Sequence, residues 1–238
     1  MKSNSIFIFK GRTKKVIIFL LGFFIQIFVF AQNNLKTYEE LISSVHQKQI
    51  ELGVIYKKTH SIKLQDSIID AAQFYIYKTI VNEFFNHWYG TSWSFYGQTR
   101  IPKYGSIACG YFVTTILYDA GFDIPRVEWA KLASEVFIKK FSRDIKRFRN
   151  EPIENIKNYA LNKSNGLYIV GLDCHVGFVF KYNDTVKFIH SNYYEPEIGV
   201  MSQDFEGNNP LDNSSYVVLG KILDKDALIK WLNQSKFK

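Results

Sequence analysis

The chain has 238 residues, of which 47% are hydrophobic and 17% aromatic, and its formal net charge is +8. This length and composition exclude an intrinsically disordered chain and are sufficient for one domain with a sizeable core. Five basic residues and no acidic residues precede residue 32, so the rest of the chain carries only +3, which does not indicate a nucleic-acid-binding protein.

The first 31 residues have the pattern of a secretory signal peptide. A basic segment precedes the apolar run Val16 to Phe30, and Ala31 provides a small residue at the cleavage position. The alternative is an uncleaved membrane anchor, but this 15-residue region is shorter than the roughly 20 residues that span a bilayer. No cysteine follows for lipid modification. We therefore expect a periplasmic or secreted protein that begins at Gln32 and has no stable membrane span.

Two amphipathic helices are predicted next. The first covers 33–53 and ends at Gly53, and the second covers 66–88. We expect residues 32–65 to form a helical extension that precedes a domain of residues 66–238. Three histidines in this part of the chain have no spacing typical of metal ligands, so we predict no metal site: His46, His60 and His87.

Residues 89–102, YGTSWSFYGQTRIP, are predicted to form a loop because they are rich in glycine and small polar residues. Loops on a rigid scaffold often carry binding residues. Trp93, Phe95 and Tyr96 are candidates to line a substrate groove. The alternative is that these aromatic side chains cover the core.

A third helix is predicted within 105–121, GSIACGYFVTTILYDAG, with Ser106 as N-cap and Gly121 at its end. One helix face is apolar, and Cys109 lies in the first turn. There the free backbone N–H groups and the helix dipole favour a thiolate, the nucleophilic form of cysteine. Cys109 is therefore a candidate nucleophile, although a cysteine in an apolar helix is often only a small core residue.

The C-terminal half changes from helical to strand periodicity, which predicts an α+β domain. Helices are predicted at 126–141, 152–161 and 224–234, the last with Asp224 as its cap. Strands are predicted at 167–172, 175–182, 185–192, 198–202 and 216–223. The basic run between Lys139 and Arg149 is interpreted as a solvated helix face, or alternatively as a surface for an anionic partner.

Asn183 and Asp184 form a plausible two-residue hairpin turn between two of these strands. That register places His175 opposite Asn192 and pairs Gly177 with His190, all on one face. A cysteine, a histidine and a further polar residue are the parts of a cysteine hydrolase. The alternative is a disulfide between Cys109 and Cys174, the only two cysteines, which would leave no nucleophile. Against it, Cys174 is adjacent to His175 on a strand, so their side chains point to opposite faces.

The segments GTSWSFYG, ACGYFV, HVGFVF and KFIHS, within about residues 89–200, resemble the NlpC-type papain-like cell-wall cysteine peptidases and, more loosely, the CHAP amidases. The resemblance implies a papain-like fold, with the nucleophile helix packed on an antiparallel sheet between N-terminal helices and a C-terminal helix. It implies Cys109 as nucleophile, His175 as base and His190 as the residue that orients the base. Asn192 remains the alternative third residue.

The sequence departs from this family at the residues that flank the nucleophile. The family commonly has Asp before the cysteine and Ser after it, whereas Ala108 and Gly110 stand here. Trp93 takes the place of a tyrosine in the upstream loop, and we expect its indole N–H, with the Cys109 backbone N–H, to bind the oxyanion. Tyr96 is the other candidate substrate-binding residue.

The expected function is hydrolysis of amide bonds by a monomer, in peptidoglycan stem peptides or another peptide, without metal or cofactor. Two alternatives remain open. One is an inactive periplasmic binding module with the same fold, and the other is a structural envelope domain with a disulfide.

Overall fold

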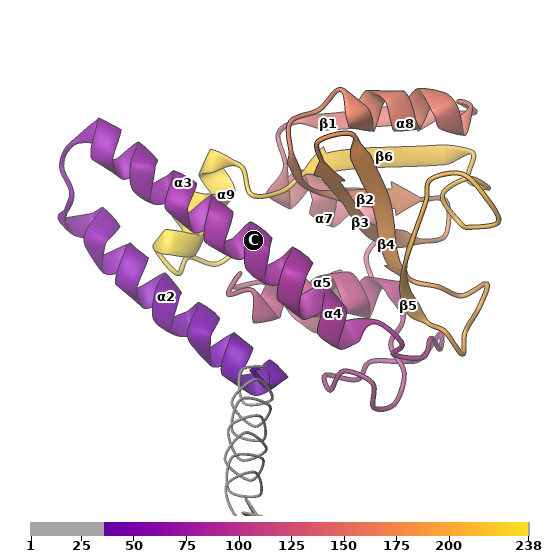
Figure 1. Cartoon of the computed structure of the whole chain (residues 1–238), viewed down its shortest axis with the longest axis horizontal. Helices are drawn as coiled ribbons and strands as arrows, with labels where there is room; N and C mark the ends of the chain where they lie inside the picture. Colours follow the sequence, from indigo (N-terminus) through magenta and orange to yellow (C-terminus); the bar gives the residue numbers. More distant parts are fainter. Residues whose placement is uncertain (1–35, 238) are drawn as a thin grey trace, which may run out of the picture. The chain divides into compact units, whose positions relative to one another are not determined.

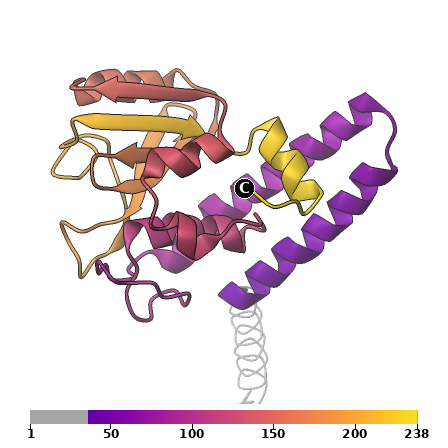
Figure 2. The same cartoon turned by 180° about the vertical axis from the view of Figure 1, so that it is seen from behind.

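The computed structural model describes residues 36–237 of the chain. A compact unit begins at Tyr38, and the predicted signal peptide lies outside the described residues. The unit is an α+β structure that contains a six-stranded antiparallel sheet and helices on both of its faces (Figures 1 and 2). Within residues 36–237, no helix is both long and apolar enough to cross a membrane.

Two long antiparallel helices open the unit. They are α2 (Tyr38–Lys58) and α3 (Ile62–Lys78), and α3 continues through a π-helical turn (Thr79–Phe84) into α4 (Phe85–Trp88). The expected boundary between residues 65 and 66 lies within α3.

The prediction that the first helix ends at Gly53 is wrong, because α2 continues for five more residues. A Cβ atom at Gly53 would lie 2.4 Å from the carbonyl oxygen of Leu232. The glycine therefore permits a close helix contact rather than a helix end. Nearby, the Gln49 side-chain amide donates to the carbonyls of Gly121 and Trp231, so α2 is bonded to distant parts of the chain.

Helix α5 (Cys109–Asp119) places Cys109 at its first position and is followed by Gly121 with φ +87°, as predicted. The residues of the predicted apolar face are buried: Phe112, Val113, Ile116, Leu117 and Ala120. Ser106 is not the N-cap. The cap position belongs to Ala108, which has no capping side chain, while Ser106 forms an isolated bridge with Ser92.

The helix predicted over 126–141 is two helices, α6 (Arg126–Trp129) and α7 (Ser134–Phe141). Between them Ala133 has an extended backbone (φ −55°, ψ 131°), which interrupts the helical path.

The interpretation of the basic run as a helix face is wrong for its second half, which forms strand β1 (Ile145–Arg149). This strand pairs only with β6 and so forms one edge of the sheet. Phe148 is its one buried side chain, and exposed basic side chains are typical of edge strands that avoid further pairing.

The remaining elements follow the predicted order. They are α8 (Ile153–Leu161), β2 (Gly166–Leu172), β3 (Val176–Tyr182), β4 (Thr185–Ser191), β5 (Val200–Gln203), β6 (Tyr216–Lys221) and α9 (Lys225–Leu232). The strand order across the sheet is β1-β6-β2-β3-β4-β5. The predicted hairpin register is confirmed, since Tyr182 pairs with Thr185 and Phe178 with Ile189. Asp224 caps α9 by accepting a hydrogen bond from the Ala227 N–H, as predicted.

The sheet separates two hydrophobic clusters. Helix α5 packs on β3 and β4, with Phe112 against Phe178, and this larger cluster includes residues of α2, α3, α7 and α9. The opposite face, which includes Val179 and Phe188, packs against α8. Both faces of the β3–β4 hairpin are therefore covered by helices. This packing fixes the positions of the residues at the ends of the two strands.

Candidate functional site

Cys109 begins α5 beside the start of β3. Burial raises the pKa of the Cys109 thiol, and the nearby backbone N–H groups of Val176 and Gly110 oppose this shift without reversing it. The predicted preference for thiolate is therefore not found in the free protein. Burial in apolar surroundings outweighs the N–H groups at the helix start.

Two histidines and a glutamine form a chain of side-chain contacts. His175 Nε2 lies 2.9 Å from His190 Nδ1, and His190 Nε2 lies 2.7 Å from Gln203 Oε1. His175 directly precedes β3, whereas His190 lies on β4 and Gln203 ends β5. The confirmed hairpin register places Gly177 beside His190, and a Cβ atom at Gly177 would lie 2.9 Å from His190 Cβ.

The remaining ring nitrogen of His175 is buried and has no hydrogen-bond partner among the described residues, Cys109 included. The thiol thus lies next to Val176, but the expected thiol–imidazole hydrogen bond is not formed. The reason lies in the sheet. Helix α5 packs on the face of Phe178, whereas His190 stacks on Phe188 of the other face, with ring centroids 4.0 Å apart. Cys109 and the pair of histidines therefore belong to opposite faces of the sheet, and Cys109 and His175 both lie near the start of β3.

Both histidines are neutral in the folded protein at neutral pH. Burial, together with the nearby His190, holds the pKa of His175 well below 6.5. Burial lowers the pKa of His190 to about 4, although the hydrogen bond to Gln203 opposes this shift. A neutral imidazole with a free ring nitrogen is a proton acceptor, which is the form that a general base requires.

Asn192, the alternative third residue, has other partners. Its Oδ1 accepts a hydrogen bond from the Tyr194 N–H at 2.9 Å, and its Nδ2 lies 3.2 Å from the sulfur of Met201. The side chain therefore holds the turn that follows β4. The structure brings His190 to His175, and not Asn192.

Of the three aromatic candidates in the loop, Trp93 is linked to the histidines through Tyr193. Its ring centroid is 5.9 Å from that of Tyr193, which in turn is 5.1 Å from that of His175. The indole Nε1 of Trp93 is buried without a hydrogen-bond partner in the part of the chain that the structure describes. Tyr96 is 85% exposed and its ring contacts that of Phe95 edge-on.

Tyr193 and Gln203 also contact the histidines, and neither is predicted from the sequence. Burial is the largest cause that raises the pKa of Tyr193 to about 12, and the neighbouring Tyr194, Cys174 and Cys109 contribute. No motif marks Tyr193. Gln203 could have been found from the pairing of β4 with β5, which sets it diagonally across from His190.

Cys109 and Cys174 are both free thiols, and Cys174 is exposed. The alternative of a structural disulfide between them is therefore wrong. Among residues 36–237, no three His, Cys, Asp or Glu side chains are grouped as metal ligands would be.

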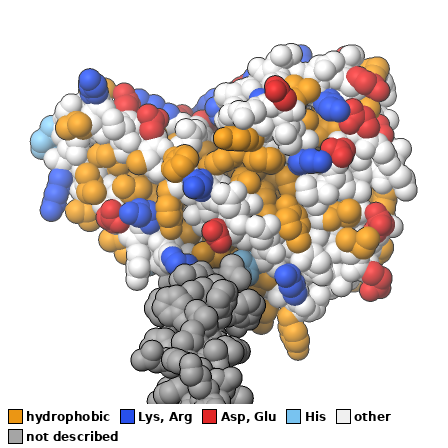
Figure 3. Space-filling view, viewed as in Figure 1, with side chains coloured by type: hydrophobic (Ala, Val, Ile, Leu, Met, Phe, Trp, Pro, Cys, Tyr) orange, Lys and Arg blue, Asp and Glu red, His pale blue; other side chains and the backbone are white. Residues whose placement is uncertain are grey.

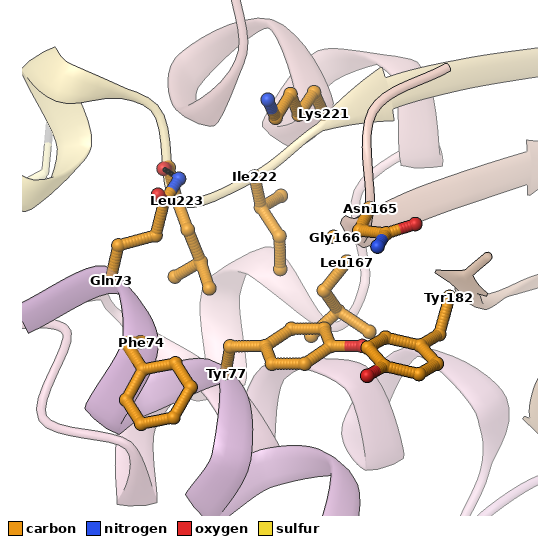
Figure 4. Close-up of a pocket in the computed structure, with 10 residues that line it drawn as sticks. All are labelled: Gln73, Phe74, Tyr77, Asn165, Gly166, Leu167, Tyr182, Lys221, Ile222 and Leu223. Atoms are coloured by element: carbon orange, nitrogen blue, oxygen red, sulfur yellow. Dashed lines mark hydrogen bonds between the residues drawn. The ribbon is translucent and has the colours of Figure 1, made fainter. Parts of the chain in front are cut away.

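A separate cavity of about 220 Å³ lies at the far end of β3, lined by Tyr77 of α3, Tyr182 and Leu223 among others (Figure 4). None of the candidate catalytic residues lines this cavity.

Hydrophobic side chains spread over the middle of the molecular face drawn in Figure 3.

Comparisons with family models, with curated proteins and with solved structures find no match to this chain.

Proposed function

We propose that the protein is an exported cysteine hydrolase of the papain-like type, which cleaves amide bonds in peptidoglycan stem peptides. One observation carries this proposal. His175 contacts His190 through Nε2 and keeps a buried, unpartnered Nδ1, and Cys109 begins a helix beside Val176, the residue that follows His175. This arrangement supports Cys109 of α5 as the nucleophile, His175 directly before β3 as the base and His190 of β4 as the residue that orients the base.

The neutral thiol and the neutral imidazole favour one order of steps. Cys109 Sγ attacks the amide carbonyl while its proton passes to His175 Nδ1. Nδ1 then returns the proton to the leaving amine as the C–N bond breaks. Water, deprotonated by His175, hydrolyses the thioester and releases the carboxylic acid and the free thiol. Catalytic hydrogen bonds are often long in free enzymes, and substrate binding is expected to bring the thiol to Nδ1.

Peptidoglycan is proposed as substrate because the resemblance covers the nucleophile helix and both histidine strands. The loop before Cys109 also presents Phe95 and Tyr96, which are 72% and 85% exposed and available to a bound peptide or glycan. Mass spectrometry of purified peptidoglycan fragments incubated with the protein tests this directly. The proposal requires new amine and carboxylate termini within the stem peptides.

An inactive binding module with the same fold is the second candidate, favoured by the missing Cys109–His175 hydrogen bond. Such a module would sediment with peptidoglycan and leave the fragments intact in the same experiment.

The raised pKa of Cys109 makes its alkylation rate a test of the resting state. Because burial disfavours the thiolate, we expect the rate with iodoacetamide to rise continuously from pH 7 to pH 9. The measurement uses a Cys174→Ala variant, so that only Cys109 is labelled. A rate that is already constant below pH 7 would instead indicate a thiolate–imidazolium pair.

Replacing Trp93 with Phe tests the oxyanion site. The substitution removes the unpartnered indole N–H and keeps an aromatic ring. Loss of one oxyanion donor typically lowers kcat by about 100-fold or more. Because Nε1 has no partner in the free protein, we expect the melting temperature to be unchanged or higher. A normal kcat in Trp93→Phe would exclude this N–H from the oxyanion site.

A further inference from the structure

The contacts of His190 extend beyond His175 to a residue of the edge strand β5. Register pairs His190 with Met201 and Phe188 with Gln203, so His190 and Gln203 are diagonal neighbours on one face. His190 Nε2 and Gln203 Oε1 are 2.7 Å apart, a normal hydrogen-bond distance. His190 itself is fully buried.

We propose that Gln203 is a positioning residue that sets the tautomers of both histidines and so leaves His175 Nδ1 unprotonated to act as the base. This inference rests on the proposed hydrolase function. An amide oxygen only accepts hydrogen bonds, so the ring nitrogen facing Gln203 Oε1 must carry the proton.

The proton positions follow in sequence from that one contact. A neutral imidazole carries one N–H, so a proton on His190 Nε2 leaves His190 Nδ1 as an acceptor. His190 Nδ1 faces His175 Nε2 at 2.9 Å, and this nitrogen must therefore donate. His175 Nε2 then carries the only ring proton, and Nδ1 has a free lone pair.

The opposite orientation of the Gln203 amide would move the ring proton of both histidines to the other nitrogen. If its NH₂ group faced His190 Nε2, the proton of His190 would lie on Nδ1 and that of His175 would also lie on Nδ1. His175 would then have no free basic nitrogen, because its Nε2 would accept the hydrogen bond from His190. The Gln203 amide orientation thus determines whether the base is competent.

Nitrogen-15 NMR of histidine-labelled protein tests the proposal without reference to activity. The wild type is expected to show His175 and His190 both protonated at Nε2, with Nδ1 unprotonated. In Gln203→Leu we expect His190 to become a mixture of tautomers. Gln203→Glu, whose carboxylate can only accept, is expected to restore the wild-type proton positions on both rings.

Turnover of the cleaved substrate gives the second readout. Loss of one neutral hydrogen bond predicts a fall in kcat of about tenfold for Gln203→Leu, with recovery in Gln203→Glu. Gln73→Leu is the matched control, because Gln73 donates one amide hydrogen bond to the Leu223 carbonyl outside the site. This control should keep both the tautomers and the rate of the wild type.

The outcomes separate the two proposals. A wild-type His175 protonated at Nδ1, or tautomers unchanged in Gln203→Leu, would overturn the role of Gln203 even if the protein cleaves its substrate. Absence of cleavage with the expected tautomers would overturn the hydrolase function and leave the hydrogen-bond chain intact.

Discussion

We expect Cys109→Ser to abolish the proposed amide cleavage and Cys174→Ser to leave it within about twofold of the wild-type rate. The two substitutions are chemically identical, and both cysteines are free, but only Cys109 lies at the helix start beside Val176. A serine hydroxyl is a far weaker nucleophile than a thiol beside a neutral imidazole. Removal of a catalytic nucleophile typically costs at least about 10⁴-fold in kcat.

Steady-state cleavage of peptidoglycan fragments, followed by mass spectrometry, measures both variants. Thermal unfolding is the control, and we expect both melting temperatures to stay near that of the wild type because a sulfur is replaced by an oxygen of similar position. Residual cleavage by Cys109→Ser above one hundredth of the wild-type rate would rule out Cys109 as nucleophile. Loss of cleavage in Cys174→Ser alone would identify Cys174 as the nucleophile instead.

We expect Gly110→Ser to lower the free energy of unfolding by about 3 kcal/mol, although serine is common at this position in the family that the sequence resembles. A Cβ atom at Gly110 would lie 2.2 Å from the carbonyl oxygen of Ala130, which follows α6. That oxygen belongs to the backbone, so the loop between α6 and α7 must move to admit a side chain. The glycine thus reflects the close approach of this loop to the nucleophile helix.

The matched substitution on the other side of Cys109, Ala108→Ser, is expected to raise the free energy of unfolding. Ala108 is the N-cap of α5 with extended backbone (φ −76°, ψ 158°) and no capping side chain. In Ala108→Ser the hydroxyl can accept a hydrogen bond from a free N–H of the first turn, which adds about 0.5–1 kcal/mol. Urea unfolding of the two variants measures both changes. Equal free energies of unfolding for Gly110→Ser and the wild type would show that the loop between α6 and α7 can move without loss of stability.

The sequence predicted those parts of the fold that depend on local periodicity. The apolar face of α5 follows from residues three and four apart, and the hairpin register follows from a two-residue turn between alternating strands. The contact between His175 and His190 is a consequence of that register. These features require no knowledge of distant parts of the chain.

The features that were missed depend on distant contacts. Gly53 resembles a helix end until α9 is packed against it, and β1 resembles a solvated basic helix until β6 pairs with it. The pKa of Cys109 depends on how much apolar surface surrounds the thiol, which helix position alone does not reveal. Tyr193 and Gln203 reach the histidines through a turn and an edge strand, where no local pattern marks them.

Helix α2 packs against α9, which is far away in the sequence, as well as against its sequence neighbour α3. Gln49 bonds to the carbonyl of Trp231, and Gly53 touches that of Leu232, across more than 170 intervening residues. The first helix of the unit is therefore held against its last helix by a hydrogen bond and a close backbone contact. Removing α2 would expose Trp231 and Leu232, so we expect a shortened chain without α2 to have a lower free energy of unfolding.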